Sequence, residues 1–123
     1  MATLNDRVFD NGLTVLDTEA DEIHVTSSEA TTYAEATSTY TLGNSGSLSI
    51  GAPADRAGGG RQVTVAAISD GSVTGTGTAA FYAIVDTSNS RLLATGALSS
   101  SQSVTSGNAF TLAEFTIGIP DPA

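Results

Sequence analysis

The chain has 123 residues and no cysteine, which is the length of one domain and excludes a disulfide framework, a thiolate metal site and a thiol nucleophile. Its formal net charge of −9 disfavours binding to nucleic acid, because a negative surface repels phosphate. No apolar run approaches the roughly 18 residues of a membrane span, and the N-terminus lacks a signal-peptide pattern. We therefore expect one domain that folds in the cytoplasm and contacts neither nucleic acid nor a membrane.

The acidic side chains are concentrated at the start of the chain. Residues 1–35 contain eight of the 13 carboxylates but only one of the four arginines. This distribution fits a solvated acidic face, and it also fits a docking face for a basic partner. The candidate interaction residues in this region are Asp6, Asp10 and Asp17.

Residues Thr3–Ala20 are the one strong helix candidate, because their apolar side chains form a broad stripe at helical spacing. The Asn11–Gly12 pair weakens this prediction. A glycine inside a helix costs about 1 kcal/mol relative to alanine, and Asn-Gly is also a favoured hairpin turn. A hairpin that pairs Arg7–Phe9 with Leu13–Leu16 is therefore the alternative.

The next segment predicts a strand followed by a short excursion. Glu22–Thr26 alternates between polar and apolar residues, which places Ile23 and Val25 inward and His24 on the other face. His24 is the only histidine and has no partner at metal-ligand spacing, so we expect it to be structural. One short helical turn is expected over Thr32–Ala36, and Tyr33 and Tyr40 are expected to anchor this excursion on the core.

Two short strands, Tyr40–Gly43 and Ser47–Gly51, are expected on either side of a turn at 44–46. The following residues, Ala52–Gly60, form the longest predicted irregular segment. A glycine-rich phosphate loop needs a helix after it, whereas a strand, Arg61–Ile68, is predicted here. We expect instead a flexible tip that contacts a neighbouring subunit, and its candidate interaction residues are Arg56, Gly58, Gly59 and Gly60.

Asp70–Gly71 is a strong turn signal, so it predicts a hairpin between the 61–68 strand and a strand over Val73–Thr78. The glycines of the second strand mark close approach of another chain segment, which Phe110 or Phe115 is expected to provide.

Residues Ala79–Val85 are apolar at every position, so both faces of this strand are expected to be covered. The Asp86–Ser90 cluster predicts a turn, because Asp, Ser and Asn side chains bond to their own backbone. Arg91–Thr95 then pairs back as the second strand of a hairpin. The serine-rich residues 97–105 are expected to form an edge strand and a loop.

The last strand contains a change of phase. Phe110 and Leu112 share one alternating face, whereas the apolar residues from Ala113 to Ile119 lie on the other. A one-residue slip of this kind is what a β-bulge produces, so a bulge is expected at residues 112–114.

The whole pattern predicts an antiparallel β-sandwich of about seven or eight short strands with one N-terminal helix. Residues 1–20 are expected to form the helix or arm, and residues 21–123 the sandwich, within a single domain.

The residues that most enzymes use are scarce. The chain has one histidine and no lysine, and it lacks the Gly-x-Ser-x-Gly pattern of a hydrolase nucleophile. The carboxylates between Asp17 and Glu22 offer oxygen ligands for calcium, yet their order does not match a calcium-loop spacing. We expect no catalytic residue, no cofactor and no metal, and we expect that the chain is not an enzyme.

Several stretches occur in an order that resembles small structural proteins of tailed bacteriophages and prophages. The resemblance covers most of residues 48–122 and implies a virion component without catalytic residues. The acidic N-terminal region departs from a plain sandwich. The stretches are Gly51–Asp55, Arg61–Val65, Ser72–Ala79, Ala83–Asp86, Leu92–Thr95, Ser106–Phe110 and Ile117–Pro122.

The resemblance implies a capsid decoration, or cement, protein that stabilises the head lattice. Its expected partners are the major capsid protein or another virion protein, with self-association into a homo-oligomer. A tail or fibre-attachment protein (baseplate or adaptor) is an alternative, and a receptor- or glycan-binding module on a fibre is another. In each case the implied location is the virion, assembled in the host cytoplasm.

Overall fold

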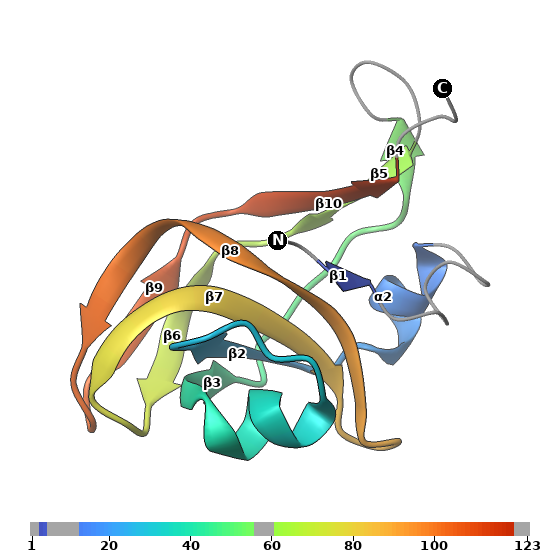
Figure 1. Ribbon diagram of the computed structural model, residues 1–123. Coiled ribbons are helices and arrows are strands. Elements are labelled where there is room, and N and C mark those ends of the chain that lie inside the picture. Colours follow the sequence, from blue (N-terminus) through green and yellow to red (C-terminus); the bar gives the residue numbers. More distant parts are fainter. Residues whose placement is uncertain (1–2, 5–12, 56–60, 120–123) are drawn as a thin grey trace.

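The computed structural model describes residues 3–4, 13–55 and 61–119, which form two antiparallel sheets (Figure 1). A seven-stranded sheet has the order β1-β8-β7-β2-β3-β6-β9, and a three-stranded sheet has the order β10-β5-β4. The predicted fold class, an antiparallel β-sandwich with one N-terminal helix, is confirmed. The elements are β1 (Thr3–Leu4), α2 (Thr14–Glu19), β2 (Glu22–Thr26), the π-helical turn η1 (Glu35–Thr39), β3 (Thr41–Ser45), β4 (Ala54–Asp55), β5 (Arg61–Val65), β6 (Ile68–Val73), β7 (Gly77–Asp86), β8 (Arg91–Val104), β9 (Ala109–Leu112) and β10 (Phe115–Ile119).

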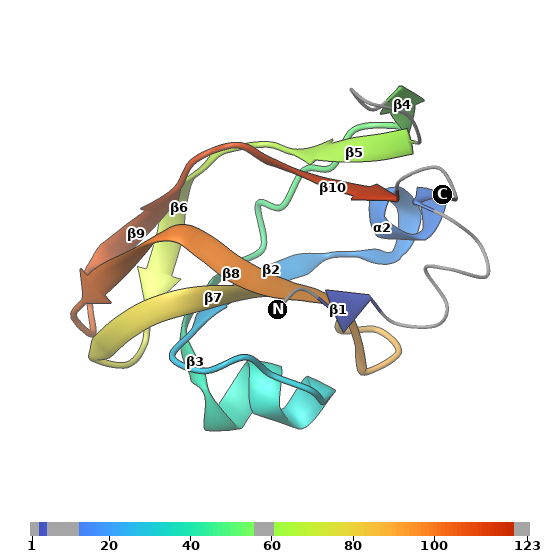
Figure 2. The same cartoon turned by 45° about the horizontal axis from the view of Figure 1, so that its top comes forward.

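Strand β7 lies in the middle of the large sheet, between β8 and β2. Its Tyr82 and Ile84 belong to the main core, which the large sheet shares with β5 and β10. Its Ala83 and Val85 face the opposite side, where the η1 excursion covers them (Figure 2). Burial of both faces of this strand confirms the prediction made from its uninterrupted apolar sequence.

The η1 excursion is held by reciprocal hydrogen bonds at its start. The backbone N–H of Glu35 donates to the Thr32 hydroxyl oxygen at 3.1 Å, and the Glu35 carboxylate accepts from the Thr31 N–H at 2.8 Å and from the Thr31 hydroxyl at 2.7 Å. These contacts resemble a capping box, and they lower the pKa of the Glu35 carboxyl. Tyr33 and Tyr40 pack on the buried alanines below, as predicted.

The chain crosses between the two sheets three times. It passes from the large sheet to the small one between β3 and β4, returns to the large sheet between β5 and β6, and enters the small sheet again between β9 and β10. The predicted hairpin turn at Asp70–Gly71 is wrong, because both residues lie inside β6. The predicted bulge at 112–114 is also wrong: the change of phase marks the crossing at residues 113–114, where the inward face changes because the chain changes sheet.

Phe110 explains why glycine occupies two strand positions. A Cβ on Gly71 would lie 2.2 Å from the Phe110 ring, and one on Gly43 would lie 3.2 Å from the same ring and 2.5 Å from a backbone oxygen. The ring therefore occupies the space beside two glycines of neighbouring strands. The glycines for which a large neighbour was predicted, Gly75 and Gly77, lie against Leu42 instead.

The N-terminal helix is shorter than the predicted Thr3–Ala20. Thr3–Leu4 form β1 on the edge of β8, where strand pairing satisfies their backbone groups, and the helix covers only Thr14–Glu19. Residues 5–12 lie outside the described part of the chain. The alternative hairpin is wrong over Leu13–Leu16, because the chain becomes helical there and buries both leucines.

Strand β3 is longer than predicted and the strand after it is missing. The expected turn at 44–46 is wrong at Asn44, because this residue pairs with His24 inside the large sheet. Of the predicted strand Ser47–Gly51, only Ile50 forms a bridge, to Val65. The segment 52–60, predicted to be irregular, contains the short strand β4 paired with β5.

The turn at 86–90, between β7 and β8, and the turn at 106–108, after β8, are as predicted. The Asp86 carboxylate accepts hydrogen bonds from the Ser88 N–H at 3.1 Å and from the Asn89 side chain at 2.8 Å. Gly107 has a φ of +92°, which suits glycine in the turn at 106–108. Strand β8 runs for 14 residues, so the predicted strand Arg91–Thr95 and the serine-rich edge form one continuous element.

Replacement of Gly71 by alanine tests the fit of Phe110 over the large sheet. The new methyl group would overlap the buried ring, so we expect Gly71→Ala to lower the free energy of unfolding by about 1–3 kcal/mol. The matched control is Gly51→Ala, because a Cβ there has nothing within 4 Å; its effect is expected to stay within about 0.5 kcal/mol. Urea denaturation measures both, and equal effects would contradict the packing described.

Candidate functional site

The interaction residues expected from the sequence fall mostly outside the described part of the chain. Of that set the structure describes Asp17, which lies exposed on the short helix α2. The residues that lie outside are Asp6, Asp10, Arg56, Gly58, Gly59 and Gly60.

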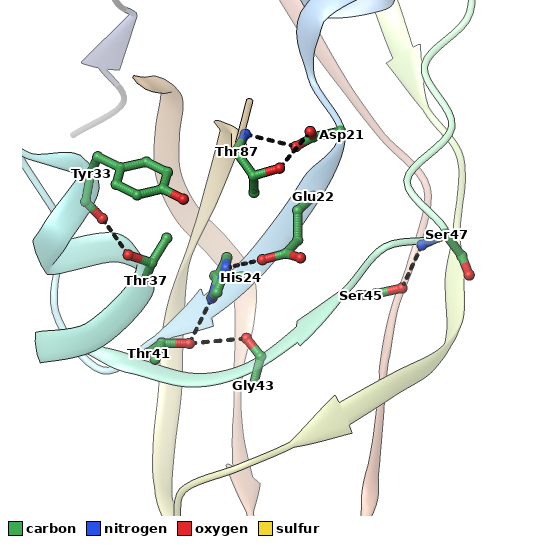
Figure 3. Close-up of polar contacts among 10 residues, drawn as sticks. All are labelled: Asp21, Glu22, His24, Tyr33, Thr37, Thr41, Gly43, Ser45, Ser47 and Thr87. Carbon is green, nitrogen blue, oxygen red and sulfur yellow. Dashed lines mark hydrogen bonds and ion pairs between the residues drawn. The ribbon is translucent and has the colours of Figure 1, made fainter. Parts of the chain in front are cut away.

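The acidic residues near Asp17 have separate structural partners. The Asp21 carboxylate accepts hydrogen bonds from the Thr87 N–H at 3.0 Å and from the Thr87 hydroxyl at 2.6 Å, which ties the start of β2 to the β7–β8 turn (Figure 3). Glu19 pairs with Arg91 at 3.3 Å. Within the described residues, no three His, Asp or Glu side chains gather closely enough to hold a metal ion.

His24 is buried in a polar network on the face of the large sheet that η1 covers. Its Nε2 lies 2.6 Å from Glu22 Oε1, and its Nδ1 lies 2.8 Å from the Thr41 hydroxyl, which is itself 3.2 Å from the Gly43 carbonyl (Figure 3). The sequence correctly placed His24 on the face opposite Ile23 and Val25. It did not indicate the two partners, because one of them belongs to a strand 17 residues away.

The protonation state of His24 follows from this environment. Burial lowers the pKa of the imidazole below its ordinary 6.5, and the Glu22 carboxylate offsets part of this shift. In the neutral ring, Nε2–H donates to Glu22, and Nδ1 faces the Thr41 hydroxyl, whose single proton can go to Nδ1 or to the Gly43 carbonyl. All of these contacts lie within the sheet, so the network fixes strand pairing and lacks the open side that a general base needs.

A surface pocket of about 550 Å³ lies on another part of the molecule, between the outer half of β8 and the crossing from β9 to β10. This volume is within the range of small-ligand sites. Aromatic and aliphatic side chains alternate with hydroxyls around it, and Glu114 is the one charged residue of the lining. The lining residues are Tyr82, Ala97, Leu98, Ser99, Ser100, Gln102, Thr111, Leu112, Ala113, Glu114, Phe115 and Thr116.

Two irregularities of the backbone open this pocket. Opposite β7, the pairing jumps from Ala79↔Gln102 to Phe81↔Ala97, so the four residues 98–101 of β8 stand against the single Ala80. On the other side, residues 113–114 carry the chain out of the large sheet. Bulges of this kind bend a strand away from its neighbours and frequently border binding sites.

The tyrosine at the bottom of the pocket joins the two sheets. The Tyr82 and Phe115 ring centroids are 4.6 Å apart, with the ring planes inclined at 45°. Tyr82 also lies against Gly96, its pair on β8, where a Cβ would lie 2.7 Å from the tyrosine ring. Burial raises the pKa of the Tyr82 hydroxyl, which therefore stays neutral.

The pocket was not predicted from the sequence, although the two segments that form its walls were each recognised as unusual. The serine-rich residues 97–105 and the change of phase at 112–114 were interpreted as an edge strand and a bulge. The sequence contains no signal that these two segments, which belong to different strands, face one another. Their proximity is established by the Gln102 side chain, which donates to the Thr111 carbonyl at 2.6 Å.

The lining of the pocket is suited to binding. It contains hydroxyls, one amide and one carboxylate around an aromatic floor, and none of its serines or threonines has a histidine or lysine beside it in the lining to act as a base.

In the described part of the chain, no helix has the length and hydropathy that crossing a bilayer requires.

The His24 network predicts a pH dependence of stability. The folded-state pKa lies below the unfolded value of 6.5, so the unfolded chain binds more protons as the pH falls. We expect the free energy of unfolding to decrease below about pH 6.5, at up to about 1.4 kcal/mol per pH unit. Urea denaturation of the native chain and of His24→Gln at several pH values measures this slope. A slope that is unchanged in His24→Gln would contradict the assignment.

Comparison of the chain with protein-family models, with curated proteins and with solved structures finds no significant match. A function for this chain therefore has to follow from the geometry of the described residues and from the pattern of its sequence.

Proposed function

We propose that this chain is a structural protein of a tailed-bacteriophage virion and that it acts through contacts with other proteins of the particle. The most direct form of this role is capsid decoration, in which small domains bind the head lattice and stabilise it. The order of sequence motifs over residues 48–122 supports the phage assignment. The all-β fold is compatible with it, but a fold alone does not imply a function.

The observation that carries the proposal is the open flank between β8 and the β9–β10 crossing. There the apolar side chains of Leu98 and Phe115 are only partly buried, beside strand edges. β9 pairs with β6 on one side, and the partner of β8 on its outer side is the two-residue β1, which reaches only Thr95 and Ala94 in the described residues. A protein that works by contact needs a surface of this kind.

Three aspartates outside this flank stabilise the fold through hydrogen bonds. Asp86 organises its own turn, and Asp21 binds Thr87 across the β2–β7 end of the sheet. Asp70 accepts from the Ser47 hydroxyl at 2.9 Å and thereby connects β6 to the loop after β3. These contacts suit a domain whose surface must keep its shape in an assembly.

The expected partners are the major capsid protein or another virion protein, together with further copies of this chain. The same pocket is the specific observation that favours a second candidate, a glycan- or receptor-binding module on a tail fibre. Its aromatic floor and ring of hydroxyls are groups that sugar sites use. A glycan array with the purified chain separates the two, because a specific hit favours the fibre module.

The location of the chain in purified particles tests the proposal. Particles of the phage or induced prophage that encodes this chain are banded by density and analysed by mass spectrometry and by antibody labelling in the electron microscope. We expect the chain to co-purify in a copy number comparable to that of the major capsid protein, with label on the heads. Label confined to the tail would replace decoration by tail attachment, and absence from the particles would overturn the proposal.

A further inference from the structure

The pocket between β8 and the β9–β10 crossing has two backbone edges on opposite sides. On one side, the bulged residues 98–101 stand outside the ladder with β7. On the other, β9 ends the large sheet, and its Thr111 carbonyl is bonded to the Gln102 side chain. A side-chain amide thus makes a hydrogen bond of the kind that a strand lying between β8 and β9 would make through its backbone.

The floor of the pocket is apolar and partly open. Tyr82 is 9% exposed, and the Phe115 ring at 4.6 Å from it is only half-buried. Leu98 of the bulge and Leu112 at the end of β9 complete the apolar walls. A side chain inserted here gains contact with two aromatic rings, and a cation placed over such rings gains a further electrostatic attraction.

The charge of the pocket selects among occupants. Glu114 is exposed at its edge and is the one charged residue of the lining, and the whole chain carries a net charge of −9. An anionic ligand would be repelled, whereas a basic side chain would be attracted to Glu114 and to the ring faces. The backbone edges favour an extended peptide over a small molecule, because only a peptide offers donors and acceptors along a strand.

We propose that this pocket receives an extended segment of a partner protein, with an arginine or lysine side chain lying against Tyr82 and Phe115 and paired with Glu114. This inference rests on the proposed function, because the partner is then another protein of the particle. The segment would lie between β8 and β9, and the Thr111 carbonyl would exchange its bond with Gln102 for a bond with the segment's backbone.

A pair of synthetic peptides tests the proposal on the full chain. The probe is acetyl-Thr-Val-Arg-Val-Thr-amide, and its matched control carries glutamate in place of arginine. We expect the arginine peptide to shift the backbone amide NMR signals of residues 97–102 and 111–116, and we expect the glutamate peptide to bind at least about tenfold more weakly. The affinity of the arginine peptide should fall as salt is added, because the ion pair with Glu114 is exposed.

Three variants locate the binding. Glu114→Gln should weaken binding of the arginine peptide by about twofold to fivefold. Asp70→Asn removes the same charge from an exposed site that does not line the pocket, and should leave the affinity unchanged. Ala113→Trp fills the mouth from an exposed position, so it should abolish binding while the urea midpoint stays that of the native chain.

Four outcomes would overturn the inference. Three concern the peptides: no shifts with either peptide at millimolar concentration, equal binding of the two peptides, or shifts that lie outside the pocket. The fourth is saturation of the same signals by a neutral sugar, with no effect of Glu114→Gln on that binding. The last result would make the pocket a glycan site. If the chain is found in virions but does not bind the peptide, only this inference is overturned. If the chain binds the peptide but is absent from particles, the virion assignment is overturned and the pocket remains a peptide site.

Discussion

The contact of Tyr82 with Gly96 and Phe115 is the packing constraint on which the rest of the structure depends. Tyr82 stands on the central strand β7, Gly96 is its direct partner on β8, and Phe115 begins the strand that belongs to the other sheet. The ring leans over β8 because Gly96 has no side chain, in the way that an aromatic residue covers a glycine in a neighbouring strand. One side chain thereby connects the large sheet to the small one and lines the pocket.

The parts of the fold that the sequence predicted are those that short-range chemistry determines. Ala79–Val85 had to be covered on both faces because it has no polar residue to present to water, and the structure covers it with the core on one side and η1 on the other. The Asp86–Ser90 turn was predictable because an aspartate side chain accepts hydrogen bonds from the backbone N–H groups that follow it, as Asp86 does here. Glu22–Thr26 was predictable from its alternation.

The errors arose where a distant residue decides the local structure. Asp70–Gly71 has the sequence of a hairpin turn, yet it lies in β6 because the Phe110 ring, 39 residues away, requires a residue without a side chain there. The change of phase after Leu112 was noticed, but a bulge and a change of sheet give the same sequence pattern. The pocket was missed for the same reason, because its walls meet only through the curvature of the large sheet.

The chemistry of the described residues fits a domain that acts by contact. His24 is bonded on both ring nitrogens within the sheet, and Asp21 and Asp86 secure a strand end and a turn. The pocket with apolar side chains lies between strand edges, where both backbone and side-chain groups are available to a bound protein. The functional proposal therefore depends on the shape and charge of the flank between β8 and the β9–β10 crossing.

Tyr82 holds the two sheets together by lying on Gly96 and against Phe115. A nuclear Overhauser experiment on the purified chain measures this most directly. We expect cross-peaks from the Tyr82 ring protons to the Gly96 α-protons and to the Phe115 ring. Cross-peaks that place the Tyr82 ring away from Gly96, or on the face of β7 that η1 covers, would contradict it.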